Sequence, residues 1–183
     1  MDLQTAASIV PLLGWAVHGS VLARRLASAR RDPLTGLHTR AGWTARAEHL
    51  IRRHPTAAVL LVDLDHFKTL NDSHGHAAGD AALVATAHRL RAWCGRNGTA
   101  GRLGGDEFVA IVQDLDAAGL DALTAALDRP LDYAGRSLPL AASVGVCPLA
   151  ELPVPLLTDA LAAADAAMYA AKGRGRRGSR LSR

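Results

Sequence analysis

The sequence predicts one α+β domain, in which helices alternate with the strands of a sheet that contains an antiparallel hairpin. Two apolar runs, residues 57–64 and 138–146, have the composition of buried strands. Between them, two glycines at 104–105 separate the strand-like runs 99–103 and 108–112 and so predict a hairpin. Segments with helical spacing stand between the strands, and this order is typical of an α+β architecture.

Length and composition are those of a globular protein with a full hydrophobic core. The chain has 183 residues, of which 49% are hydrophobic and 21% are charged. Cys94 and Cys147 form neither a disulfide framework nor a metal-binding spacing, so we expect core thiols in a reducing compartment. The net charge is +4, and basic residues crowd both flanks of the domain without interleaved aromatic residues, so we expect no nucleic-acid partner.

The N-terminal segment is a candidate membrane anchor. Residues 3–23 contain no Asp, Glu, Lys or Arg, and these 21 residues are enough to span a bilayer as a helix. Arg24 and Arg25 follow directly, so the positive-inside rule predicts a single-pass protein of the bacterial inner membrane with a cytoplasmic C-terminal domain. The alternative is an amphipathic helix that packs on a second copy and leaves the protein in the cytoplasm.

The elements follow one another from residue 24 onward. Residues 24–31 are a helix extension or a linker, and Asp32-Pro33 begins a turn in which Gly36 permits a positive φ. Thr39 is expected to cap a helix over about 40–53, and Pro55 separates this helix from the strand 57–64. The remaining expected elements are a short helix at 66–73, a loop at 75–79, a long helix to about 94, the hairpin, a helix at 116–127, the strand 138–146 and a last helix to about 172.

The hairpin tip, Gly104-Gly105-Asp106-Glu107, carries the strongest chemical signal. Glycines permit a tight turn and let a phosphate approach the backbone closely. Carboxylates are hard oxygen ligands of the kind that Mg²⁺ prefers. Taken alone, the same residues are also compatible with an ordinary hairpin that has acidic turn residues.

Asp63 is a second carboxylate with a reason to bind metal. It ends an apolar strand, and a carboxylate in that position must be paired or bind a cation. If the hairpin lies on the adjacent strands, Asp63 and the pair Asp106/Glu107 converge on Mg²⁺, which would orient a triphosphate and stabilise departing pyrophosphate. For Asp65, two residues further along, a structural role and a chemical role are about equally supported.

Several motifs in one order show a resemblance to a known family. Asp32-Pro33-Leu34-Thr35-Gly36-Leu37, Asp63 to Lys68, Asn71-Asp72, Gly79-Asp80, the hairpin tip, and Ala164 to Lys172 follow one another along the chain. In order and spacing they resemble the GGDEF family of diguanylate cyclases over about residues 31–178. This resemblance implies a palm-like sheet of about five strands flanked by helices. It leaves residues 1–30 as the hydrophobic segment and basic linker, and residues 179–183 as a basic tail.

The resemblance also implies a function and a set of site residues. Two GTP molecules, each held by one domain of a homodimer, would condense to cyclic di-GMP with release of two pyrophosphates. Metal ligation by Mg²⁺, or Mn²⁺ in its place, is implied for Asp63, the Leu64 carbonyl, Asp106 and Glu107. Asp106 or Glu107 would help activate the ribose 3′-hydroxyl. Phosphate contacts are implied for Lys68, Lys172 and Arg176. From the residues themselves, Gly104 and Gly105 let a phosphate approach the backbone, and Phe67 beside Lys68 can either contribute to the wall of a phosphate loop or pack in the core.

Base choice follows from the hydrogen-bonding groups of guanine. Guanine presents N1–H and its amino group as adjacent donors, and an ionised carboxylate such as Asp80 accepts from both. Adenine has an acceptor at N1, so a carboxylate discriminates against it. Asn71 can donate to O6 or N7, and both residues match the guanine-reading positions of the family. The alternative for Asp80 is an N-cap on the helix that starts there.

One departure from the family concerns feedback. Many members carry Arg-x-x-Asp before the hairpin as an inhibitory product site, and the aligned positions here are Gly95 and Gly98. That site is therefore expected to be absent. Two non-enzymatic alternatives are a catalytically silent module that binds GTP or cyclic di-GMP, and a membrane-tethered interaction module with a basic tail.

Overall fold

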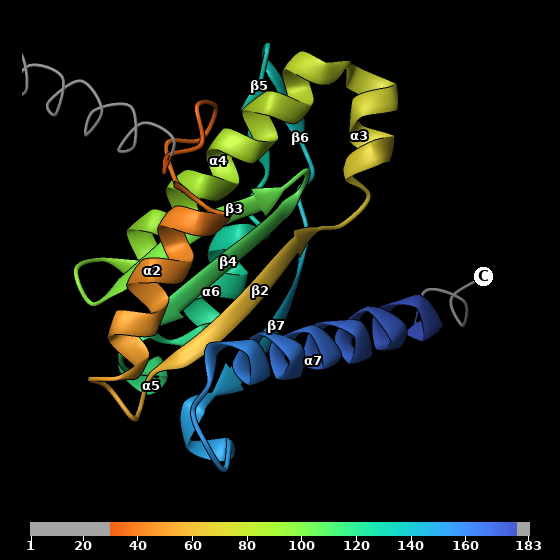
Figure 1. Ribbon diagram of the computed structural model, residues 1–183. Helices are drawn as coiled ribbons and strands as arrows, with labels where there is room; N and C mark the ends of the chain where they lie inside the picture. The colour runs from red at the N-terminus through yellow and green to blue at the C-terminus, as the bar shows by residue number, and fades with distance from the viewer. Residues whose placement is uncertain (1–29, 179–183) are drawn as a thin grey trace, which may run out of the picture.

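The computed structural model describes residues 30–178, with side chains described through Lys172, and confirms the predicted α+β fold (Figure 1). Five strands form a mixed sheet in the order β1-β3-β4-β2-β7. In it β2 pairs antiparallel with both β4 and β7, β3 pairs antiparallel with β4, and β1 pairs parallel with β3. The strands are β1 (His38–Thr39), β2 (Ala58–Leu64), β3 (Gly98–Gly104), β4 (Glu107–Val112) and β7 (Ala142–Pro148).

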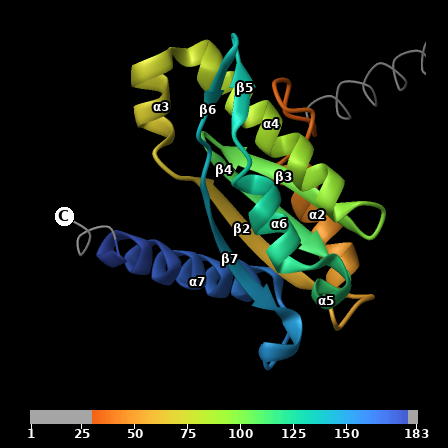
Figure 2. The same cartoon turned by 180° about the vertical axis from the view of Figure 1, so that it is seen from behind.

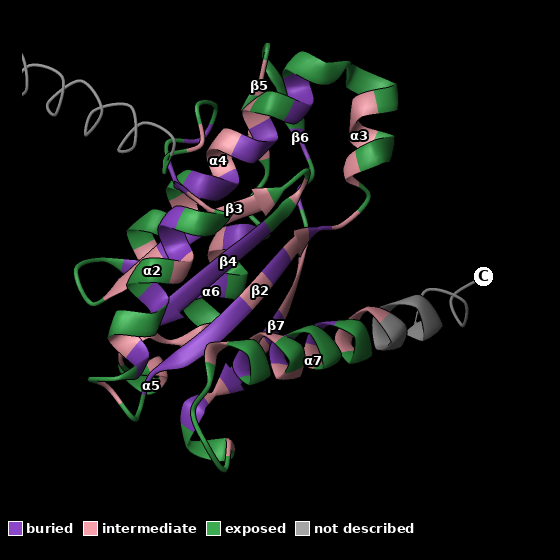
Figure 3. Ribbon diagram, viewed as in Figure 1, coloured by how far each residue is buried: buried purple, intermediate pink, exposed green. Residues whose placement is uncertain are grey.

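Helices cover both faces of this sheet. Figures 1 and 2 show α2 (Arg40–Ile51) and α7 (Leu157–Gly178) on one face, and α4 (His76–Cys94) and α6 (Leu120–Leu127) on the other. Each face has its own core cluster. Leu60, Val62 and Leu64 of β2 belong to the cluster under α4, whereas Val59 belongs to the cluster under α2 and α7. The central strands are therefore buried on both sides, as the purple of β2 and β4 in Figure 3 shows.

Local signals explain where several elements begin. The Thr39 hydroxyl accepts a hydrogen bond from the Gly42 amide at 3.5 Å, so the predicted N-cap of α2 is confirmed, although the helix ends at Ile51 rather than near 53. The short helix α3 (Phe67–His74) follows β2 as expected. Cys94 and Cys147 are buried free thiols, which confirms their assignment to the core.

Three expectations about the elements were wrong. The stretch 75–79 is not a loop, because α4 begins at His76 directly after the positive-φ residue Gly75. The helix expected at 116–127 is divided into α5 (Leu115–Ala118) and α6 by Gly119, whose φ is +72°. Residues 138–146 are not one strand. Leu138 ends a small separate hairpin, β5 (Leu131–Tyr133) and β6 (Arg136–Leu138), and the sheet strand β7 begins only at Ala142 and precedes the 3₁₀ turn η1 (Leu149–Glu151).

The first turn of the domain is tied to the tip of the β3–β4 hairpin by Arg102. The Arg102 guanidinium donates from Nε and Nη2 to the Gly105 carbonyl oxygen, at 3.0 and 2.7 Å, and from Nη1 to Asp32 Oδ1 at 3.2 Å. Asp32 also accepts from the Thr35 amide and hydroxyl, at 2.8 and 2.6 Å. Burial alone would raise the pKa of Asp32, but the hydrogen bonds from Thr35 and Arg102 outweigh it and lower that pKa.

The candidate membrane segment, residues 3–23, and the basic tail, residues 179–183, lie outside the described residues. Within residues 30–178, none of the helices combines the length and the apolar character needed to cross a bilayer.

Replacing Arg102 by Lys should loosen the hairpin tip. A lysine ammonium cannot keep a two-nitrogen contact with Gly105 and the bridge to Asp32 at the same time. A lost hydrogen bond to a charged group corresponds to about 1.5–3 kcal/mol, so amide exchange across residues 104–106 should quicken by roughly tenfold or more. Hydrogen–deuterium exchange would measure this change, with Arg136→Lys in the separate hairpin as the matched control. Equal protection in both variants would contradict the role assigned to Arg102.

The stability of the domain should fall between about pH 6.5 and pH 4 because of His38. Burial, together with the positive charges of Arg31, Arg46 and Arg91, lowers the pKa of this histidine to about 4 from 6.5. The unfolded chain therefore binds a proton that the folded domain rejects, and this difference costs about 2 kcal/mol of unfolding free energy between pH 7 and pH 5. In urea denaturation, His38→Gln should remove most of this loss of unfolding free energy. His49→Gln, at an exposed position of α2, should lose as much unfolding free energy as the parent. A His38→Gln variant with the parental pH dependence would show that another group is responsible.

Candidate active site

Asp63 is placed by the register of β2 between its two neighbours. Its Cα lies opposite Glu107 of β4 and opposite Ser143 of β7. Because side chains alternate along a strand, Asp63 shares the sheet face of Val59, under α2 and α7, and its cross-strand neighbour Glu107 emerges on the same face. Like charges directly opposite one another destabilise a sheet, so this pair calls for a cation beside it.

One such cation is Lys172 of α7. Its ammonium nitrogen Nζ donates to Asp63 Oδ1 at 2.6 Å. The helix can reach this position because Gly145 of β7 has no side chain: a Cβ there would lie 2.6 Å from the Met168 Cβ and would collide with the Ala164 carbonyl oxygen. Gly145 therefore sets how closely α7 packs on β7 and where Lys172 lies.

The continuation of α7 bears on Arg176. Gly173 and Gly175 do not end the helix, which runs to Gly178. Lys172 and Arg176 are therefore one turn apart on the same helix, which is the backbone arrangement that a joint phosphate contact requires. The side chain of Arg176 lies outside the described side chains.

The hairpin tip exposes its backbone. Gly104 and Gly105 have φ values of +152° and +51°, and a Cβ at either residue would meet no other atom within 4 Å. The adjoining Asp106 carbonyl oxygen accepts from the Leu64 amide at 3.4 Å, so the tip is joined to the end of β2. Arg102 fixes the tip from the other side. The sequence does not predict this role of Arg102, because nothing beyond its place two residues before the glycines marks it.

The oxygen atoms of Asp63, Glu107 and the Leu64 backbone are of the kind that binds Mg²⁺, although the structure does not bring three carboxylates together. Among the described side chains, no three acidic, histidine or cysteine groups stand close enough together to hold a metal. Asp63 is held by Lys172 instead, and unscreened carboxylates repel one another. Asp63 and Glu107 nevertheless face each other on one side of the sheet, with the Leu64 backbone adjacent, and hard oxygens of this kind suit Mg²⁺.

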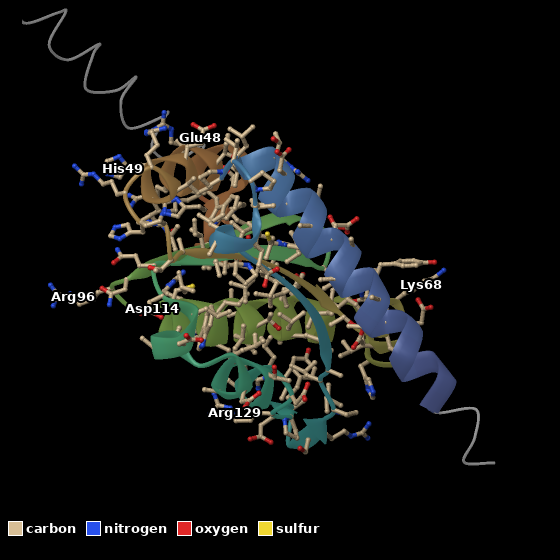
Figure 4. The ribbon with its side chains drawn as sticks, turned by 90° about the horizontal axis from the view of Figure 1, so that it is seen from below. Glu48, His49, Lys68, Arg96, Asp114 and Arg129 are labelled. Carbon is tan, nitrogen blue, oxygen red and sulfur yellow. The ribbon has the colours of Figure 1, made fainter. Side chains whose placement is uncertain are left out.

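The start of α3 brings a second cation and free amides. His66 precedes the helix with φ +58° and makes no side-chain cap, so the first amides of α3 have no side-chain acceptor. Lys68 stands in the first turn, is exposed, and projects beside α7 in Figure 4. Phe67 is half-buried against the core under α4, which supports the packing role that was the alternative to a phosphate-loop wall.

The two predicted guanine readers are brought together by Gly79. A Cβ at residue 79 would collide with the Asn71 amide, whose Cγ would lie 2.9 Å away, so Asn71 of α3 packs on the α4 backbone directly before Asp80. Asp80 is exposed and is the fifth residue of α4 rather than its cap. The N-cap alternative for Asp80 is therefore wrong.

Asp65 has structural partners. Its Oδ1 accepts from the Ser143 hydroxyl at 2.8 Å, and its amide donates to the Ala141 carbonyl oxygen at 2.9 Å. These bonds join the end of β2 to β7. Of the two interpretations left open for this carboxylate, the structural one agrees with its contacts.

Comparison with known proteins identifies relatives of this chain. A family model described as "Diguanylate cyclase, GGDEF domain" matches residues 29–178. An uncharacterized 19.3 kDa protein in the repSA 5′ region of Streptomyces ambofaciens is 81% identical over 183 residues, 100% of both chains. Diguanylate cyclase TpbB of Pseudomonas aeruginosa is 36% identical over 168 residues, which are 84% of this chain and 38% of TpbB.

Solved structures show the same relationship. The crystal structure of a sensory box/GGDEF family protein from Caulobacter crescentus has a TM-score of 0.72 and 38% identity, and the match covers 80% of this chain and 99% of that one. The GGDEF domain of TpbB has a TM-score of 0.71 and 34% identity, over 79% of this chain and 89% of that one. The five-stranded fold, the Gly-Gly-Asp-Glu hairpin tip and these matches together show that the chain belongs to the GGDEF family of diguanylate cyclase domains.

Proposed function

We propose that this protein is a diguanylate cyclase that condenses two GTP molecules into cyclic di-GMP and two pyrophosphates. The observation that carries the proposal is that Asp63 and Glu107 lie opposite each other on one face of the sheet. Lys172 of α7 reaches this face and pairs with Asp63, and the open backbone of Gly104 and Gly105 lies at the nearby hairpin tip. Carboxylates, an ammonium group and free backbone amides are the groups that phosphoryl transfer requires.

The metal ligands are the oxygens at the end of β2 and at the hairpin tip. Asp63, the Leu64 carbonyl, Asp106 and Glu107 would hold Mg²⁺, or Mn²⁺ in its place. When bound, the metal polarises the α-phosphate and neutralises the charge that develops on pyrophosphate. Asp106 or Glu107 also accepts the proton of the ribose 3′-hydroxyl as it becomes a nucleophile.

The triphosphate is held by cations from two helices and by backbone amides. Lys68 at the start of α3, and Lys172 with Arg176 on α7, supply the positive charge. The uncapped N-terminus of α3 and the side-chain-free backbone of Gly104 and Gly105 supply amide donors, and an anion is stabilised at a helix N-terminus. Phe67 anchors this start of α3 in the core.

Guanine is read by the pair that Gly79 holds together. The Asp80 carboxylate accepts from guanine N1–H and the amino group, while the Asn71 amide donates to O6 or N7. Both residues lie where α3 packs on α4, so the base would be bound at this junction.

The reaction requires two copies of the domain. Each 3′-oxygen forms a bond to the α-phosphorus of the other GTP, each α-phosphorus loses pyrophosphate, and each 3′-hydroxyl gives its proton to a carboxylate. One domain has one such site, so the two attacks need a homodimer in which the sites face each other. Incubating the purified protein with GTP and Mg²⁺ and analysing the product by mass spectrometry tests the proposal directly, and a product other than cyclic di-GMP would refute it.

Replacing Glu107 by Gln should lower cyclic di-GMP formation by about 100-fold or more. The amide removes one charged oxygen donor beside Asp63, and charge stabilisation of this kind contributes several kcal/mol to the transition state. The rate of product formation measures the effect. Glu151→Gln, in the exposed η1 turn, is the matched control and should be as active as the parent. Parental activity in Glu107→Gln would remove Glu107 from the site.

Replacing Asp80 by Ala should weaken the use of GTP by roughly 2–4 kcal/mol, because guanine donors lose a charged acceptor. Steady-state kcat/KM for GTP is the measurement. The control is Asp72→Ala, an equally exposed carboxylate that follows Asn71 on α3. If both variants keep parental kcat/KM, guanine is not read by Asp80.

Product should not inhibit the enzyme strongly through the position of the family's Arg-x-x-Asp site. Gly95 has φ +53°, and a Cβ at Gly98 would lie 2.6 Å from the Ile111 carbonyl oxygen, so this turn offers neither the arginine nor the carboxylate and leaves no room for a side chain at residue 98. Initial rates at saturating GTP with added cyclic di-GMP test this expectation. Potent inhibition that disappears in Arg96→Ala would show that the neighbouring, exposed Arg96 rebuilds such a site.

A further inference from the structure

The described domain is electrically two-sided. Residues 30–54 carry six arginines against two carboxylates, Asp32 and Glu48. Residues 55–178 carry fourteen carboxylates against eleven lysines and arginines. The first of these segments forms the entry turn, β1 and α2, and therefore lies along the β1 edge of the sheet. A charge asymmetry of this size within one domain indicates an interaction of the basic side with an anionic partner.

Arginines from three elements meet at the entry turn. Arg31 Nη1 donates to the Gly36 carbonyl oxygen at 3.0 Å, and Arg91 Nη2 of α4 donates to the neighbouring Thr35 carbonyl oxygen at 3.2 Å. Arg46 of α2 is also near, since Arg31, Arg46 and Arg91 all help to lower the pKa of His38. We call the surface made by Arg31, Arg46 and Arg91 the arginine face.

The arginine face has no internal counter-charge. Among the described side chains the ion pairs are Arg102–Asp32 and Lys172–Asp63, so no residue of this face is paired with a carboxylate. The three guanidinium groups are exposed, and Leu34 in the same turn is 36% exposed. Positive charge of this density beside an exposed leucine is complementary to an anionic, partly apolar surface.

We propose that the arginine face docks on a membrane surface of anionic phospholipid headgroups. The sequence places the uncharged stretch 3–23 and then Arg24, Arg25 and Arg30 immediately before this face. Basic residues next to an apolar segment bind anionic leaflets, at roughly a fivefold gain in affinity for each residue close to the surface.

The test is co-flotation of the full-length protein with vesicles of phosphatidylcholine, alone or mixed with phosphatidylglycerol. The variant is Arg31→Gln with Arg46→Gln, two exposed residues of this face outside the proposed catalytic machinery. Its matched control is Arg129→Gln with Arg136→Gln, which removes the same charge elsewhere; Figure 4 shows Arg129 on the opposite side of the molecule from Glu48 and His49 of α2.

We expect the arginine-face variant to lose about 10- to 30-fold in its partition onto anionic vesicles, and the control to match the parent. Raising the salt concentration should weaken parental binding in the same direction. Hydrogen exchange across residues 40–53 should also be slower on anionic than on neutral vesicles, a readout that holds even if residues 3–23 bind both kinds.

The proposal is overturned if residues 40–53 exchange equally on both vesicles, or if the two variants partition alike. Double-stranded DNA that binds the parent more tightly than the anionic vesicles, with the same loss in the arginine-face variant, would assign the face to nucleic acid and overturn it as well.

Discussion

The hydrogen-bond register of β2 is the constraint on which the site depends. This strand is central, and its residues pair one by one with β4 on one side and β7 on the other. The register sets Asp63 opposite Glu107 and sets Asp65 within reach of Ser143. A slip of one residue would turn every side chain of β2 to the other face and bury Asp63 under α4. The side chains of β2 alternate between the two core clusters, and this alternation also determines which carboxylate faces α7.

Two further contacts hold the groups that surround this carboxylate. Gly145 lets α7 approach β7 closely enough for Lys172 to reach Asp63, and Arg102 joins the entry turn to the hairpin tip. In each case a long-range contact positions a short polar segment. A displacement of the chain before Asp32 would therefore reach the tip through a single guanidinium group, because the same side chain holds both Asp32 and Gly105.

The sequence predicts well the features that a short stretch of residues marks. The Thr39 cap, the apolar run of β2 and the two glycines of the hairpin can each be recognised from neighbouring residues. The two-residue strand β1 and the Arg102–Asp32 bridge depend on partners about 60 to 70 positions away, and no local pattern marks them. The β5–β6 hairpin was missed for a different reason. Its turn at Ala134-Gly135 has positive φ at both residues, but only one of them is the glycine that usually marks such a turn.

The Asp63–Lys172 ion pair orders two site residues, but solvent reaches it and it can be broken at small cost. Its side chains are 18% and 34% exposed, and an ion pair that solvent reaches contributes little net free energy. In the proposed reaction, Lys172 would exchange Asp63 for a triphosphate oxygen at small cost, and Asp63 would become available to a metal cation. Until that exchange, the ammonium group offsets the repulsion between Asp63 and Glu107 that the register of β2 imposes. The same lysine thus offsets the charge of Asp63 in the folded domain and, in the proposed reaction, would bind the substrate.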